Sequence, residues 1–175
     1  AHRREPRDPP YAAVVGNMDR RKNLRFLFGA VERLREIHPR FELKVVGPGR
    51  PPGDGEGIRF LGYRDDLELA AIYAGARFVV QPSMYEGFGL PVLEALAAGA
   101  PVACSDIPVF REVAGAAARY FAPDDRAGAA AAMEELLTDD ALCADLSRQG
   151  RERAERFSWT ETATRVKAVF DEVAP

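Results

Sequence analysis

The chain has 175 residues, and its 47% apolar and 29% charged residues are typical of a globular protein large enough to bury a core. Its 24 basic and 27 acidic side chains leave a net charge of −3, which argues against a strongly basic nucleic-acid-binding protein. Two cysteines without a paired spacing and two histidines do not predict a metal or redox centre, and no apolar run is long enough to span a bilayer.

The first stretch, residues 1–10, holds three prolines and five charged side chains, and we interpret it as a linker. From 11 to 175 the pattern predicts one domain in which short apolar runs alternate with amphipathic stretches. Strands are predicted at 12–15, 41–46, 58–61, 77–81, 101–104 and 119–121. Helices are predicted at 23–38, 65–73, 91–98, from near 108 onward, and near 125–138, 140–156 and 159–173.

This alternation predicts an α/β fold, namely a doubly wound, Rossmann-like parallel sheet of about six strands with helices on both faces. Cys104 and Cys143 are expected to be buried small apolar side chains in a reducing compartment. Ligands of such sheets bind beyond the carboxyl ends of the strands, near the point where the strand order reverses. The loops that follow the strands are therefore the candidates: 16–23, 47–57, 62–65, 82–90 and 105–108.

The loop over 82–90 joins a strand to a helix and contains two glycines. Gly87 and Gly89 have no Cβ, so the backbone there can approach a ligand closely. The amides of Gly89 and Leu90 stand where a helix begins, which favours an anion. Glu86 and Glu94 suit the hydroxyl pairs of a sugar or a ribose. The alternative is a tight loop in which Glu94 merely favours the first half of the helix.

The loop over 16–23 carries three consecutive cations, Arg20, Arg21 and Lys22, at the end of a strand. Local basicity in an acidic protein favours an anionic ligand such as a diphosphate. The alternative is a solvated turn that leads into a helix. Neither the dinucleotide-binding pattern G-x-G-x-x-G nor the P-loop pattern G-x-x-x-x-G-K-[ST] occurs, which weakens the nicotinamide and P-loop interpretations.

Residues 86–95, EGFGLPVLEA, resemble the E-x7-E signature of retaining GT-B glycosyltransferases, the "glycosyl transferases group 1" family. Residues 15–24, VGNMDRRKNL, resemble the phosphate loop of that family. Further matches in order and spacing lie at 45–47, 60–63, 82–83, 99–102 and 156–159. The resemblance covers about residues 11–173, nearly the whole chain, and the ordered set of motifs is highly specific.

The resemblance implies the C-terminal, donor-binding domain of a GT-B enzyme, whose N-terminal domain would lie outside these residues. It implies transfer of a sugar from a nucleotide diphosphate sugar with retention and without a metal or other cofactor. Lys22, on the donor diphosphate, and Glu86, on the sugar hydroxyls, would be the catalytic residues. The donor-binding set implied is Asn17, Arg21, Lys22, Tyr63, Glu86, Gly87, Phe88, Gly89, Leu90 and Glu94. In that set Glu94 would hold the ribose and Tyr63 would lie near the base.

The sequence departs from the family at Asn17, where many members have an arginine that clamps phosphate. Arg20 or Arg21 could supply that charge. The form of this loop resembles mannosyl- or rhamnosyl-type transferases of surface polysaccharides, so GDP-mannose is the first choice of donor and a UDP-linked sugar the alternative. The acceptor implied is a glycan or a lipid-linked glycan.

Two other interpretations remain open. The chain by itself would be a module that binds a nucleotide sugar and transfers nothing without its N-terminal domain. A peripheral membrane role would use the arginines near the C-terminal helices, at 148, 151, 153 and 156, although Glu152 and Glu155 interleave with them as on a solvated helix face. The expected location is the cytoplasm, and the alternative is a peripheral position at the inner face of the membrane.

Overall fold

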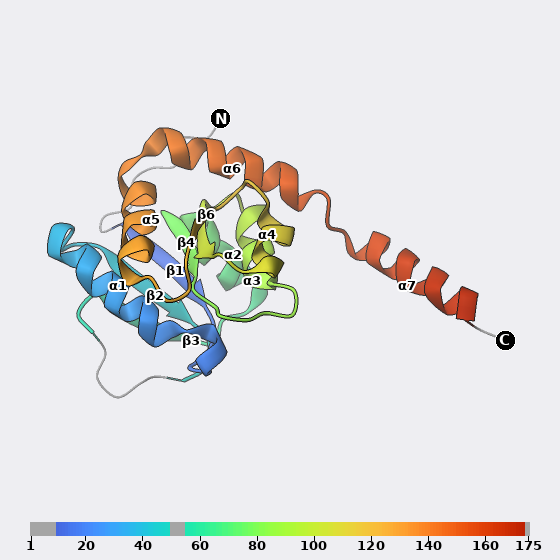
Figure 1. Ribbon diagram of the computed structural model, residues 1–175, viewed down its shortest axis with the longest axis horizontal. Helices are drawn as coiled ribbons and strands as arrows, with labels where there is room; N and C mark the ends of the chain where they lie inside the picture. Colours follow the sequence, from blue (N-terminus) through green and yellow to red (C-terminus); the bar gives the residue numbers. More distant parts are fainter. Residues whose placement is uncertain (1–9, 50–54, 174–175) are drawn as a thin grey trace.

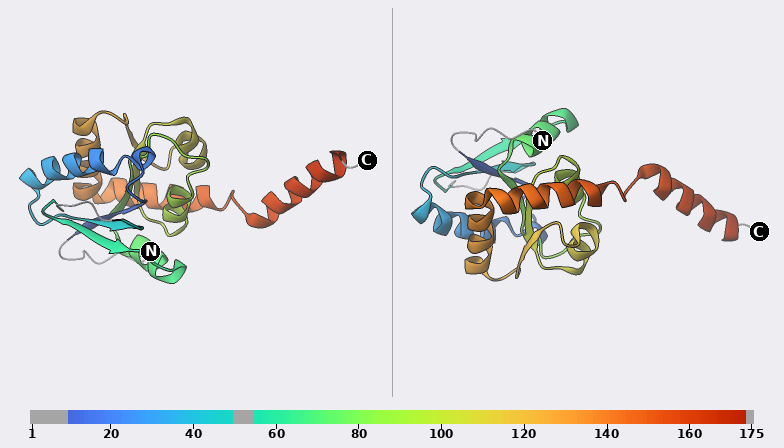
Figure 2. Two further views of the ribbon diagram at one scale, coloured as in Figure 1. Left: turned by 90° about the horizontal axis from the view of Figure 1, so that it is seen from below. Right: turned by 90° about the horizontal axis from the view of Figure 1, so that it is seen from above.

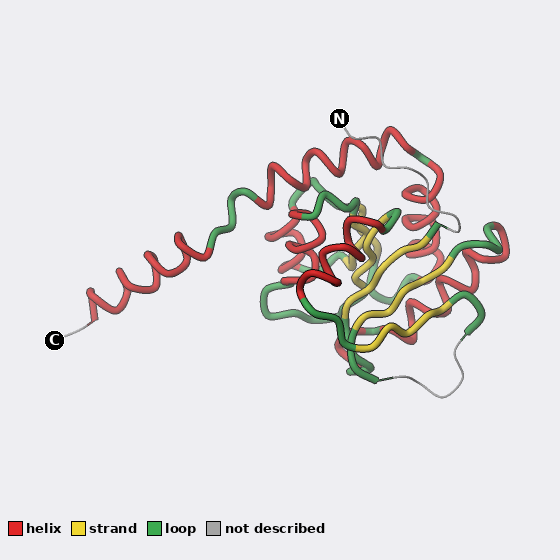
Figure 3. Tube along the Cα trace, turned by 180° about the vertical axis from the view of Figure 1, so that it is seen from behind, coloured by secondary structure: helices red, strands yellow, loops and turns green. Residues whose placement is uncertain are grey.

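The computed structural model describes residues 10–49 and 55–173. Its strands form one parallel sheet, shown in yellow in Figure 3, in the order β3-β2-β1-β4-β5-β6. The strands are β1 (Tyr11–Val15), β2 (Glu42–Val46), β3 (Ile58–Gly62), β4 (Phe78–Gln81), β5 (Val102–Ser105) and β6 (Arg119–Phe121). The predicted doubly wound sheet of six strands is confirmed. The linker predicted for 1–10 lies, except for its last residue, outside the described residues.

The helices follow the predicted ranges to within two residues. They are α1 (Leu24–Ile37), α2 (Asp66–Gly75), α3 (Leu90–Ala97), α4 (Pro108–Ala114), α5 (Arg126–Thr138), α6 (Asp140–Ala154) and α7 (Trp159–Val173). A short 3-10 turn over Arg20–Lys22 precedes α1, where the sequence predicted only a loop. Asp65 explains why α2 begins where it does, because its side chain accepts a hydrogen bond from the amide of Glu68 in a capping box.

The core lies in two layers, one on each face of the sheet. Alternate strand residues face opposite sides, so Ala12 and Val14 belong to the layer under α1 and α5. Tyr11 and Ala13 belong to the layer under α2, α3 and α4 (Figure 1). Strands buried on both faces account for the continuous apolar runs in the sequence.

The last two helices differ in how they contact this sheet and its layers. Helix α6 packs against both α5 and α3. Helix α7 extends away from the rest of the molecule in both views of Figure 2, and all its described residues are exposed. Its exposed large apolar side chains are Trp159, Val166, Val169, Phe170 and Val173.

The two cysteines occupy the core as free thiols. Cys104 lies fully buried in β5, and burial raises the pKa of its thiol well above the ordinary value. The Cys143 thiol is buried in α6 and donates to the carbonyl of Leu136 at 3.0 Å. Both therefore act as small apolar residues, as predicted.

Strand order fixes where a ligand would meet the sheet. β1 and β4 are neighbours at its centre, and the chain leaves β1 toward β2 but leaves β4 toward β5. The order therefore reverses between β1 and β4, and the loops after these two strands diverge there. Those loops are the two that carry the candidate motifs, at 16–23 and 82–90.

Candidate functional site

The loop after β1 is built by its own polar side chains. The side chain of Asn17 accepts a hydrogen bond from the amide of Asp19 at 3.1 Å, and Asp19 caps the 3-10 turn by accepting from the amide of Arg21 at 2.9 Å. Asn23 then adopts a left-handed conformation, with φ of 56°, that links this turn to α1. Asparagine tolerates that conformation better than most residues. These local bonds determine where Lys22 projects.

Lys22 meets Glu86 across the point where the strand order reverses. The Lys22 Nζ donates to Glu86 Oε1 at 2.7 Å, and the two side chains are only 20% and 13% exposed. A main-chain bond ties the same loops together, since the amide of Met84 donates to the carbonyl of Arg21 at 2.8 Å. The structure therefore brings together the two residues that sequence analysis named as catalytic, although they lie far apart in the chain.

Glu86 is positioned by hydrogen bonds from side chains at and just after the end of β4. The Ser83 hydroxyl donates to Glu86 Oε1 at 2.7 Å. The Gln81 Nε2 donates to Ser83 Oγ at 3.0 Å and to the carbonyl of Val15 at 3.1 Å. Gln81 and Ser83 are fully buried, and Gln81 Oε1 has no partner among the described residues. A buried polar cluster thus fixes one carboxylate oxygen of Glu86.

Glu94 lies one turn into α3, with its side chain exposed. The hydroxyl of Tyr73, from α2, donates to Glu94 Oε2 at 3.0 Å. Tyr73 is only 2% exposed, and burial together with the Glu94 charge raises the pKa of its phenol well above the ordinary value. The phenol therefore remains a hydrogen-bond donor to Glu94.

The two glycines of the second loop, Gly87 and Gly89, differ in whether the fold itself requires glycine. Gly89 has φ of 88°, and a Cβ there would lie 2.9 Å from the ring of Phe110, so the fold itself demands glycine. A Cβ on Gly87 would meet nothing within 4 Å. Gly89 is the N-cap of α3, and no described residue accepts a hydrogen bond from the amides of Gly89 or Leu90. These amides remain available to a ligand at the positive end of the helix dipole.

The remaining predicted site residues are less closely joined to this centre. Arg21 is 62% exposed and forms an ion pair with Asp19 at 3.0 Å, whose pKa it lowers through hydrogen bonds. Phe88 is exposed and stacks edge-on against Phe157, with ring centroids 6.0 Å apart. Tyr63 follows the edge strand β3 and is 80% exposed. It lies at the same edge of the sheet, separated from the β4 loop by β1 and β2.

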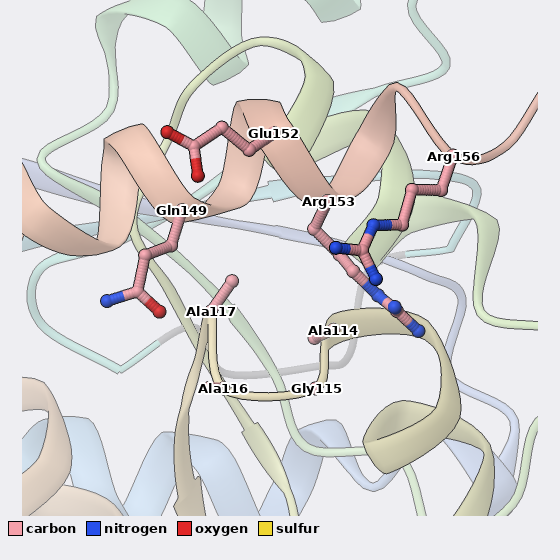
Figure 4. Close-up of a pocket in the computed structure, with 8 residues that line it drawn as sticks. All are labelled: Ala114, Gly115, Ala116, Ala117, Gln149, Glu152, Arg153 and Arg156. Atoms are coloured by element: carbon pink, nitrogen blue, oxygen red, sulfur yellow. The ribbon is translucent and has the colours of Figure 1, made fainter.

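A separate hollow of about 250 Å³ lies between the turn after α4 and the end of α6 (Figure 4). It contains none of the predicted site residues. Arg153 and Arg156 point into it, but Arg153 donates to the carbonyl of Val113 at 2.9 Å and to that of Glu112, at the end of α4. Arg153 therefore caps a helix end, which favours a structural role over ligand binding.

The peripheral membrane interpretation gains no support from the contacts of Arg148. Arg148 pairs with Asp145 at 2.7 Å and with Glu152 at 2.9 Å, as expected of a solvated helix face. None of the helices in the described ranges combines the length and apolarity needed to cross a bilayer. Within those same ranges no group of three or more metal-binding side chains gathers.

Sequence analysis assigned no role to Ser83, Gln81 or Tyr73, each of which supports a predicted carboxylate. One signal was present, because Gln81 is a polar residue that ends an otherwise apolar strand at the carboxyl edge. No comparable signal marks Tyr73, which lies 21 positions from Glu94 on another helix.

Comparison with known proteins relates this chain to glycosyltransferases. The model of the family described as "Glycosyl transferases group 1" matches residues 9–139. The chain is 38% identical to O-antigen chain mannosyltransferase B of Escherichia coli, over 88% of this chain and 44% of that protein. It is 33% identical to the phosphatidyl-myo-inositol mannosyltransferase of Mycolicibacterium smegmatis, over 97% of this chain and 47% of that protein.

Among solved structures, sucrose-phosphate synthase (tll1590) from Thermosynechococcus elongatus superposes with a TM-score of 0.83 and 28% identity. The match covers 94% of this chain and 45% of that one. The chain thus spans less than half the length of these relatives.

Proposed function

The chain belongs to the glycosyl transferases group 1 family, and from that membership we propose that it is the donor-binding half of a retaining glycosyltransferase. Its ligand is a nucleotide diphosphate sugar, held where the loops after β1 and β4 meet. The N-terminal half of a GT-B enzyme would supply most of the acceptor contacts. The proposed acceptor is a glycan or a lipid-linked glycan.

The observation that carries this proposal is the Lys22–Glu86 pair at 2.7 Å. A cation and a carboxylate then stand side by side after the central strands, and Glu86 lies on the loop that leads to the open amides of Gly89 and Leu90. Such a set matches a ligand that presents phosphate oxygens beside hydroxyl groups. Glu94, one turn farther along α3, is the proposed partner of the ribose hydroxyls.

The residue types suit departure of a nucleoside diphosphate. When the bond between the anomeric carbon and the phosphate oxygen breaks, negative charge grows on the phosphate. Lys22, with Arg20 or Arg21 and the α3 amides, would stabilise that charge without rearrangement. Asn17 Oδ1 accepts a hydrogen bond from the amide of Asp19, so the Nδ2 group is the part of this side chain left to donate to a phosphate oxygen.

Retention is proposed to follow from displacement on one face of the sugar. The bond from the anomeric carbon to the acceptor oxygen forms on the face from which the phosphate leaves, and the acceptor proton passes to a phosphate oxygen. Glu86 Oε1 already accepts from Lys22 and Ser83, which suits a carboxylate that binds sugar hydroxyls better than a free nucleophile. We propose that no metal is needed, because Lys22 and the helix supply positive charge.

GDP-mannose is the proposed donor, supported by two relatives named as mannosyltransferases. A UDP-linked sugar is the alternative. A second function deserves its own test, because the chain spans less than half the length of these relatives. By itself the chain would bind a nucleotide sugar without transferring it, and assays of transfer with and without the N-terminal half would separate the two functions.

The proposal is tested by titrating the chain with UDP, GDP, ADP and their sugars, using thermal shift and calorimetry. One nucleotide series should bind, and Glu94→Ala should weaken it by about 10–100-fold, since hydrogen bonds to a charged group contribute about 1.5–3 kcal/mol. Glu36→Ala, an exposed carboxylate on α1, is the matched control and should bind as the parent does. Equal affinity of Glu94→Ala and the parent would refute the assignment of the ribose site.

A further inference from the structure

Each carboxylate of the site has one oxygen already engaged by a buried hydroxyl group. Tyr73 donates to Glu94 Oε2 at 3.0 Å, and Ser83 donates to Glu86 Oε1 at 2.7 Å. We propose that Tyr73 and Ser83 are positioning residues that aim the free oxygen of each carboxylate at the donor. Tyr73 thereby controls how tightly Glu94 binds the ribose, and Ser83 controls how tightly Glu86 binds the transferred sugar. This inference rests on the proposed function.

Tyr73 is fixed before any ligand arrives. Its ring is 2% exposed and belongs to the core layer that includes Val92, Ala95 and Leu96 of α3. Because α3 also carries Glu94, the same packing holds the ring and the backbone of Glu94 in place. The phenol stays protonated, since burial and the neighbouring charge raise its pKa. It therefore donates to Oε2, which leaves Oε1 and the second acceptor site of Oε2 for a diol.

Ser83 has only one proton to give, and its neighbours decide where it goes. Gln81 Nε2 donates to Ser83 Oγ at 3.0 Å, so the Ser83 proton is directed to Glu86. Gln81 also donates to the carbonyl of Val15, which anchors the series of bonds to the end of β1. With Lys22 on the same oxygen, Glu86 Oε1 is doubly held and Oε2 remains for a sugar hydroxyl.

The two hydroxyls act on different halves of the donor, and this separates their effects from a general loss of structure. A substitution at Tyr73 should weaken the binding only of ligands that have ribose hydroxyls. A substitution at Ser83 should weaken the binding only of ligands that carry the sugar. A variant that merely loosened the fold would weaken every ligand alike.

For Tyr73 the test is calorimetric titration of Tyr73→Phe with the tightest binder among UDP, GDP and ADP. The same titration is repeated with its 2′,3′-dideoxy form. The ring is kept, so the core stays filled. We expect about 3–10-fold weaker binding of the ribonucleotide, the size of one net hydrogen bond, and no change for the dideoxy form. Equal weakening of both ligands, or no weakening of either, would overturn the role of Tyr73.

For Ser83 the measured quantity is the ratio of affinities for the nucleotide sugar and for its free nucleoside diphosphate. Ser83→Ala should lower that ratio by about 3–10-fold while leaving the affinity for the free nucleotide unchanged. Ser83→Thr, which restores a hydroxyl, should recover the ratio. An unchanged ratio in Ser83→Ala, or a loss that threonine fails to rescue, would overturn the role of Ser83.

The parent chain distinguishes the failure of this inference from the failure of the proposed function. If the parent binds no nucleotide, or binds the ribonucleotide and its 2′,3′-dideoxy form with equal affinity, the proposed function fails. If the parent discriminates and Glu94→Ala loses that discrimination while Tyr73→Phe keeps it, the proposed function stands and the role of Tyr73 is wrong.

Discussion

Replacing Lys22 with alanine is expected to lower the affinity for the nucleoside diphosphate by about 100-fold, which matches the loss of one or two charge-assisted hydrogen bonds. If the proposed N-terminal half is joined to the chain, the rate of the proposed transfer should fall on the order of 10²–10³, as when one preorganised hydrogen-bond donor to a developing anion is removed. The physical reason is the position of Lys22 at the reversal of strand order, where its side chain is only 20% exposed and its ammonium group lies 2.7 Å from Glu86 Oε1.

This substitution also leaves the Glu86 carboxylate without its cation, so the free energy of unfolding should fall by about 1–3 kcal/mol. Stability of the unliganded chain must therefore be measured beside ligand affinity. Arg33→Ala, an exposed cation on α1, is the matched control and should change neither quantity. If Lys22→Ala destabilises the chain yet binds nucleotide as well as the parent does, Lys22 is structural and the diphosphate site lies elsewhere.

Gly89→Ala is expected to produce the other large effect, a loss of about 2–4 kcal/mol in the free energy of unfolding together with loss of nucleotide binding. A left-handed φ of 88° penalises any side chain, and the new Cβ would lie 2.9 Å from the ring of Phe110. That ring is fully buried, so it cannot move aside without disturbing α4. Any relief of the clash must shift the amides at the start of α3.

Two glycine variants separate strain from ligand approach. Gly62→Ala has a similar φ of 72° and nothing within 4 Å, so it should lose only about 1–2 kcal/mol. Gly87→Ala meets no atom within 4 Å and should keep its stability while it weakens donor binding, because the added methyl group occupies the approach to the ligand. Normal stability and normal binding in Gly89→Ala would show that the loop does not form the site.

The sheet and the position of the site were predictable because both depend on periodicity and on the rules of parallel sheets. The apolar runs had strand lengths, and parallel strands bring their carboxyl ends to one edge. Lys22 and Glu86 each follow such a strand, so their meeting followed once β1 and β4 proved to be neighbours. The order of strands itself came only from the structure.

The supporting contacts were not predictable, because they depend on how elements pack. Tyr73 reaches Glu94 only because α2 and α3 cover the same face of the sheet, and the alanine-rich pattern of α2 does not say which side it buries. The 3-10 turn over Arg20–Lys22 depends on the capping bond from Asp19. The Asp19 carboxylate also forms an ion pair with the guanidinium of Arg21. A phosphate ligand would compete with Asp19 for Arg21, and a run of three cations in the sequence does not reveal this.

The most direct test of the donor site is a crystal structure of the chain with the nucleotide sugar that binds it most tightly. We expect phosphate oxygens within hydrogen-bonding distance of Lys22 Nζ and of the amides at the start of α3, with the ribose hydroxyls on Glu94. A ligand lodged instead in the hollow beside Arg153 and Arg156, with the Lys22–Glu86 pair unchanged and uncontacted, would contradict it.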